Sequence, residues 1–193
     1  MTKTCLGHCQ ATTPVEVLKA EHRVIERGLD AMERQLTQST IDREFFLKAL
    51  DFFRSFADRC HHAKEEGELF PVLESAGVPR DGGPIGCMLA EHEQGRRLVR
   101  VMADHLEAAA AGDKVAEDTL RRAGADYIGL LRQHIQKEDH VLFVMADHMI
   151  GPEEQKLMRS AFDRAEQSNG NSGKHERYTA VADELTRCSL ASP

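Results

Sequence analysis

The stretch HHAKEEGELF at residues 61–70 returns in altered form as HIQKEDHVLF at residues 134–143. The His, Lys, Glu, Leu and Phe positions coincide in the two stretches, and an acidic residue follows the shared Glu in both. Each stretch is preceded along the chain by a Glu-His pair, Glu21-His22 in the first half and Glu91-His92 in the second. An internal repeat of this kind predicts two helical hairpins of one design that pack into a single bundle.

Apolar residues around these stretches recur at alternating steps of three and four, which predicts helices that face a common core. Thr13-Pro14-Val15-Glu16 forms a helix start with a capping box. The expected long helices cover about residues 14–36, 41–76 and 85–112, and a fourth includes 120–145; shorter ones cover about 153–166 and 174–187. The predicted fold is all-α, an antiparallel up-down four-helix bundle with additional C-terminal helices. Residues 1–13 are expected to form a flexible arm, 14–150 the bundle and 151–193 a C-terminal helical extension.

The totals of the chain exclude several classes of protein. Its 193 residues suit one domain, and the formal net charge of −7 disfavours binding to nucleic acid or to an anionic membrane. No apolar run is long enough to span a membrane, and the N-terminus lacks the apolar core of a secretory signal. A cytoplasmic location is therefore expected.

Cysteine usage gives little indication of function. Five cysteines at irregular spacing do not suggest a disulfide framework, and Cys60 and Cys87 are expected to be buried in helices. Cys5, His8 and Cys9 form a compact group in the arm, which has too few ligands for a closed zinc site. Metal binding or redox sensing by this arm stays a minor alternative.

Polar residues occupy inward positions where a plain bundle would carry Leu or Ile. Each His and Glu of the repeated stretches are four residues apart, which puts them on one helix face. A buried carboxylate without a partner costs several kcal/mol, and cations would remove that cost. Mixed nitrogen and oxygen ligands suit iron, manganese or zinc better than calcium or magnesium. The candidate ligands are His22, His61, Glu65, His92, His134 and Glu138.

Two other interpretations apply to buried histidines and glutamates of this kind. A fully satisfied network of His-Glu hydrogen bonds would also tolerate burial, although metal ions satisfy so many polar groups more simply. A ferritin-like centre would use Glu-x-x-His pairs and more carboxylates, whereas here His precedes Glu by four residues.

The pattern H…HxxxE…H…HxxxE, from Pro14 to about Met149, resembles the hemerythrin-like proteins of the HHE cation-binding family. The resemblance implies an oxygen-bridged di-iron centre, with two Fe ions as the cofactor. It implies histidine ligands at His22, His61, His92 and His134, and bridging carboxylates at Glu65 and Glu138.

The chain departs from the oxygen-carrying members of that family. Those members place two histidines four residues apart on the third helix, whereas Met88 and Arg96 flank His92 here. The fourth-helix acid, Glu138, also comes one residue earlier than the Asp of the carriers. Both irons are then expected to have an open position, which favours reaction with hydrogen peroxide, O2 or NO over reversible oxygen carriage.

The first expectation is therefore a di-iron protein that reacts with a small diatomic or peroxide ligand. An oxidoreductase of the peroxidase or catalase type would have this function. The alternatives are a non-enzymatic module that binds or senses O2, iron or NO, and an iron donor in the repair of iron centres. Repair proteins of this family usually carry an additional cysteine-bearing domain, and only a short arm is present here. No protein partner is indicated.

Neighbouring residues have secondary expectations. Glu21 and Glu91 either orient imidazoles or are solvated acids, and Arg96 pairs with Glu91 or Glu93, or holds an anion. The remaining expectations place Glu26 on the flank of the site, Tyr127 in the core, the other acids of 65–68 and 138–139 in solvent, and Lys64, Lys137, His62, His105, His140 and His148 at the surface.

Overall fold

The computed structural model describes residues 13–168 and 174–191, and all regular secondary structure in these residues is helical. Its α-helices are α1 (Pro14–Leu36), α2 (Arg43–Phe52), α3 (Phe70–Ser75), α4 (Pro84–Ala110), α5 (Lys114–Lys137), α6 (Phe143–Met149), α7 (Pro152–Ser168) and α8 (Lys174–Ala191). Three π-helical segments interrupt them: η1 (Phe53–His62), η2 (Glu65–Leu69) and η3 (Glu138–Leu142). The all-α prediction is confirmed. The expectation for the N-terminal arm with Cys5 and Cys9 lies outside the described residues.

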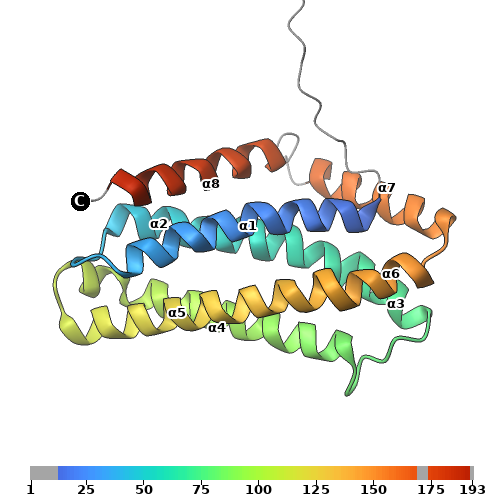
Figure 1. The fold of residues 1–193 in the computed structure, drawn as a ribbon, viewed down its shortest axis with the longest axis horizontal. Helices are drawn as coiled ribbons and strands as arrows, with labels where there is room; N and C mark the ends of the chain where they lie inside the picture. The colour runs from blue at the N-terminus through green and yellow to red at the C-terminus, as the bar shows by residue number, and fades with distance from the viewer. Residues whose placement is uncertain (1–12, 169–173, 192–193) are drawn as a thin grey trace, which may run out of the picture.

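Two of the predicted long helices are rods assembled from several segments. The rod from α2 to α3 includes η1 and η2, and the rod from α5 to α6 includes η3. Figure 1 shows these two rods lying side by side with α1 and α4. The segments η2 and η3 lie within the two repeated stretches, and η1 ends at the first two residues of the first stretch.

The first helix begins where the sequence predicts. The Thr13 hydroxyl accepts a hydrogen bond from the backbone N–H of Glu16 at 3.1 Å, and the Glu16 carboxylate accepts one from the Thr13 N–H at 3.0 Å. This reciprocal pair satisfies two of the N–H groups that a helix start leaves without partners. It fixes the register of α1 and hence the inward direction of His22.

The apolar core consists of two clusters, and the polar residues of interest lie between them. On α1, Leu18 belongs to one cluster and Ile25 to the other, and His22 lies between the two. On the rod from α2 to α3, Phe56 and Leu69 belong to different clusters in the same way. The two clusters therefore lie on either side of the polar residues along the bundle.

The last two helices cover the outside of the rods. Met158 and Phe162 of α7 pack into the cluster that contains Leu18. In α8, Tyr178 packs into the other cluster, with its ring centroid 4.9 Å from that of Phe56. Figure 1 shows α8 lying along α1.

The structure also tests the expectations for the cysteines and for a membrane span. Cys60 is buried as expected, but Cys87 is exposed, so that part of the expectation is wrong; its place on α4 faces outward while Met88 faces the core. Within the described parts of the chain, no helix has the length and apolar character needed to cross a bilayer.

Candidate metal centre

The six side chains predicted as ligands meet in the interior. They come from α1, α4 and the two rods, and each has 2% or less of its surface exposed. Glu65 directs Oε1 toward His61 Nε2 at 3.3 Å and Oε2 toward His92 Nε2 at 3.5 Å. Glu138 directs a single oxygen, Oε2, toward His22 Nε2 and His134 Nε2, each at 3.2 Å. Each carboxylate thus faces one imidazole from each half of the chain.

The potential ligand atoms form two overlapping groups. The first group contains His22, His61, Glu65 and Glu138, and the second contains His62, Glu65, His92 and His134. Within each group the ligand atoms all lie within 4.8 Å of one another, and Glu65 belongs to both groups. A carboxylate shared between two sets of imidazoles is an arrangement that can hold metal ions.

The polar atoms at the middle of these groups lack hydrogen bonds. His22 Nε2, His61 Nε2 and all four carboxylate oxygens of Glu65 and Glu138 are buried without a hydrogen-bond partner. Their contacts of 3.2–3.5 Å bring charges together but do not meet hydrogen-bond geometry. Buried polar atoms are rarely left unsatisfied, and a hydrogen-bond network was the alternative explanation for these residues. The orphaned atoms fit cations and argue against that network.

His62 is a member of the second group that the sequence argument missed. The expectation that it lies at the surface is wrong: it is 5% exposed, and its ring stacks on His92 with centroids 3.8 Å apart. Both of its ring nitrogens are buried without a hydrogen-bond partner, and Asp58 Oδ1 is 3.7 Å from Nδ1. The π-helical segment η1 explains the error, because more residues per turn bring consecutive side chains closer in direction. His61 and His62 can then both face inward.

The two groups consequently differ in their number of imidazoles. The first has His22 and His61, whereas the second has three, from His62, His92 and His134. Met88 and Arg96, which flank His92, belong to neither group. The expectation that each metal would have two histidine ligands is therefore not met by the side-chain arrangement. The only sequence signal was the His-His pair at 61–62, which has His-Ile as its counterpart at 134–135.

The outer nitrogens of four imidazoles donate to carboxylates. The Nδ1 atoms of His61 and His134 lie 3.0 Å from oxygens of Glu21 and Glu91, respectively. The other two contacts, each 2.7 Å long, join His22 to Asp139 and His92 to Glu66. Such partners fix the ring orientation and leave Nε2 free for a metal. For Glu21 and Glu91 the orienting alternative is confirmed, while the expectation that Glu66 and Asp139 are only solvated acids is wrong.

Two lysines bond to the carboxylates of Glu21 and Glu91, and the two lysines differ in burial. Lys64 Nζ bonds to Glu21 and is 3% exposed, so its predicted surface position is wrong. Lys137 Nζ bonds to Glu91, but the Lys137 side chain is 40% exposed and lies at the edge of the bundle. Burial by itself raises the pKa of Glu21, but Lys64 and His61 outweigh burial and lower the pKa to about 2. Glu21 therefore stays ionised beside His61.

Two of the imidazoles, those of His61 and His134, face enough negative charge to hold protons when no cation is bound. Burial lowers the pKa of His61, but Glu65 and Glu21 outweigh burial and raise the pKa to about 10. Burial likewise lowers the pKa of His134, and Glu138 with Glu91 raises it to about 10. The interior thus requires positive charge, which either protons or metal ions can supply.

The remaining predicted neighbours take varied positions. Glu26 pairs with Arg23 and belongs to neither group, and Tyr127 is buried against Phe53 as expected. Arg96 bonds mainly to Asp58 at 2.8 Å and Glu66 at 2.7 Å, and lies 3.7 Å from Glu93. His140 and His148 are exposed as predicted, and His105 is half-buried.

Comparisons with known proteins agree with this geometry. The sequence model of the hemerythrin HHE cation-binding domain matches residues 13–146. Uncharacterized proteins of Mycobacterium bovis and Mycobacterium tuberculosis are each 30% identical to this chain over 176 residues, which is 89% of the chain and 68% of the relative. No solved structure matches the chain.

Proposed function

Because the chain belongs to the hemerythrin HHE cation-binding family, we propose that it holds two iron ions and reacts with a small oxidant, hydrogen peroxide, O2 or NO. The observation that carries this proposal is the pair of ligand groups joined through Glu65, with orphaned nitrogen and oxygen atoms at their middle. We take α1, α4 and the two rods, within residues 14–150, as an antiparallel up-down bundle, and residues 151–193 as its C-terminal extension.

The proposed ligands are the six residues predicted from the sequence together with His62. Five imidazoles and two carboxylates form a donor set that suits iron, manganese or zinc, and the family favours iron. Bound iron would supply the electrons and the Lewis acidity for chemistry with the oxidant. The side chains of this protein would hold the metal ions, orient the imidazole ligands and enclose the centre.

Glu21 and Glu91 hold the Nδ1 protons of His61 and His134, so that the opposite ring nitrogens remain free to bind. The first group has one imidazole fewer than the second. Each group offers four side chains, the first with two carboxylates and the second with one, so the protein would leave positions for a small ligand on both sides of the centre. The apolar clusters lie at either end of this interior.

Reconstitution with ferrous iron tests the proposal. Elemental analysis should find two irons per chain, in line with the two ligand groups, and after oxidation in air the optical spectrum should show near-ultraviolet absorption from the paired ferric ions. The loaded protein should consume hydrogen peroxide, whereas His61→Ala and His134→Ala should lose metal and activity. His140→Ala is the matched control, since this histidine is exposed and on the same rod as His134. A fully loaded protein that leaves peroxide, O2 and NO unchanged would contradict the proposed reactivity.

A second candidate function is a sensor, and one set of contacts favours it. His61 bonds to Glu21, Glu21 bonds to Lys64, and Lys64 Nζ lies 5.7 Å from the centroid of the Phe162 ring on α7. A change at the metal centre could reach the outer helix through these contacts. Hydrogen exchange that slows in α7 on metal loading, in a protein that turns over no oxidant, would favour the sensor over the enzyme.

A further inference from the structure

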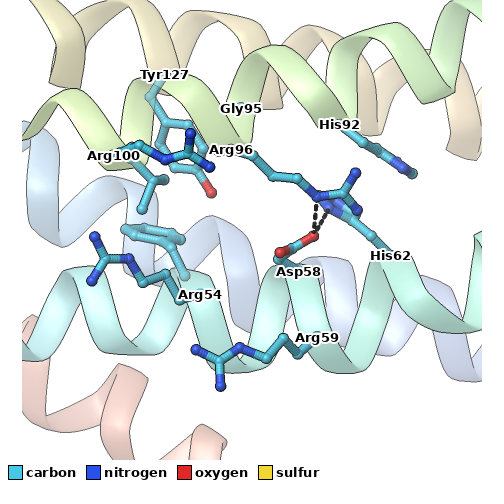
Figure 2. Close-up of a pocket in the computed structure, with 11 residues that line it drawn as sticks. Arg54, Asp58, Arg59, His62, His92, Gly95, Arg96, Arg100 and Tyr127 are labelled. Atoms are coloured by element: carbon cyan, nitrogen blue, oxygen red, sulfur yellow. Dashed lines mark hydrogen bonds and ion pairs between the residues drawn. The ribbon is translucent and has the colours of Figure 1, made fainter. Parts of the chain in front are cut away.

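A cavity of about 380 Å³ lies beside the second ligand group, between η1, α4 and α5. His62 and His92 line it, and Figure 2 shows their rings near the Asp58–Arg96 pair. Tyr127 lines it as well, and its hydroxyl is directed into the space between the helices (Figure 2). A volume of this size is enough for a small organic molecule. It exceeds what a diatomic gas or peroxide needs.

The charge of the lining is strongly positive although the whole chain carries −7. Four lining residues are arginines and one is an aspartate, Asp58, which Arg96 neutralises at 2.8 Å. In the described parts of the chain, Arg54, Arg59 and Arg100 form no hydrogen bond or ion pair. Their guanidinium groups are exposed and are free to bind an anion.

The rest of the lining is apolar or lacks a hydrogen-bond partner. Phe53, Val99 and the Tyr127 ring form apolar walls, and Gly95 leaves its part of the wall without a side chain. A Cβ at Gly95 would contact the Tyr127 ring at 3.4 Å. His62 is buried, lines the cavity and leaves both ring nitrogens without a hydrogen-bond partner. These features fit a ligand with an apolar body and a polar end.

We propose that this cavity binds a small organic carboxylate, with its charged end held by Arg54 and Arg100 and its apolar body against Phe53, Val99 and Tyr127. The two arginines lie on facing elements, η1 and α4, and a carboxylate can accept from both. The inference does not depend on which metal the neighbouring centre holds. It gives the protein a second ligand beside the small oxidant.

Calorimetric titration with three probes tests the site on the full chain, both metal-free and iron-loaded. Benzoate has the proposed charge and apolar body, benzyl alcohol keeps the shape without the charge, and inorganic phosphate keeps charge without the apolar body. Benzoate should bind at least about tenfold more tightly than either of the others, which corresponds to one good charge-assisted contact.

Two double variants of equal charge separate the site from the general field of the protein. Arg54→Gln with Arg100→Gln should weaken benzoate binding about tenfold or more. Arg97→Gln with Arg122→Gln removes the same charge from exposed arginines outside the cavity and should leave binding unchanged.

Equal benzoate affinity in the two double variants, phosphate binding as tight as benzoate, or no benzoate binding to the wild-type chain would each overturn the inference. Because iron content is measured on the same samples, this result is separate from the fate of the proposed di-iron function. A chain that fails to hold iron but binds benzoate through Arg54 and Arg100 retains the carboxylate site.

Discussion

His62 stacks on His92 in the second half of the site, and its counterpart in the repeat is Ile135, a core residue. One side chain therefore distinguishes two ligand groups that the repeat would otherwise make alike. The lysines of the repeat differ in the same way, because Lys64 is buried and Lys137 is half in solvent. At the scale of single residues, the two halves of the centre are related but not equivalent.

Replacing His62 with Ala is expected to reduce the iron content from two per chain toward one, because the second group loses an imidazole. Elemental analysis of the reconstituted variant measures this. His140→Ala, on an exposed histidine, should keep the full content. If both variants hold equal iron, His62 is not a ligand and its orphaned nitrogens serve the neighbouring cavity alone.

Replacing Glu21 with Gln should lower the free energy of unfolding of the metal-free protein by about 3 kcal/mol, since the buried Lys64 loses its ion pair with Glu21. Glu91→Gln is the matched variant in the other half. Lys137 is 40% exposed, so its loss should cost only about 1 kcal/mol or less. Urea denaturation compares the two, and equal losses would show that burial of Lys64 does not matter.

At the scale of helices, the sequence predicted most of what is found. The capping box at Thr13, the loop after Ala76 and the inward direction of His22, His61 and Glu65 all follow from spacing and helix chemistry. The π-helical turns of η1, η2 and η3 were not predicted, because they have no residue signature and arise where packing and function favour wider turns. That omission is why the sequence argument put His62 at the surface.

The outer helix α8 should contribute to stability without touching the metal centre. Tyr178→Ala removes a buried ring from Phe52 and Phe56, and we expect a loss of about 3 kcal/mol in the free energy of unfolding. Iron content should remain unchanged. Leu190→Ala in the same helix is the control, since that side chain is 69% exposed. Iron loss in Tyr178→Ala would mean that α8 helps to form the centre.

At the scale of the whole molecule, the ligand groups join α1, α4 and the two rods into one unit. The side chains that would bind metal include the buried carboxylates Glu65 and Glu138, which need positive charge from either protons or metal ions. Metal binding and helix packing are therefore energetically coupled.

Removal of iron with a chelator should lower the melting temperature, and reloading should restore it, because a ligand that binds the folded chain more tightly than the unfolded chain stabilises the fold. The variant that combines His61→Ala with His134→Ala should melt at one temperature whether or not iron is offered. Differential scanning calorimetry makes the comparison. A wild-type protein whose melting is indifferent to iron would contradict a structural role for the centre.

The exchange of ligands between the halves has a consequence for synthesis on the ribosome. Glu138 completes the group of His22 and His61, and His134 completes the group of His62. A nascent chain that ends before these residues has neither group complete, however well its first hairpin has folded. With the proposed ligands, metal insertion would wait until translation has passed Glu138 and the second hairpin has docked, and a truncated chain would carry ligands without a closed site to hold a metal.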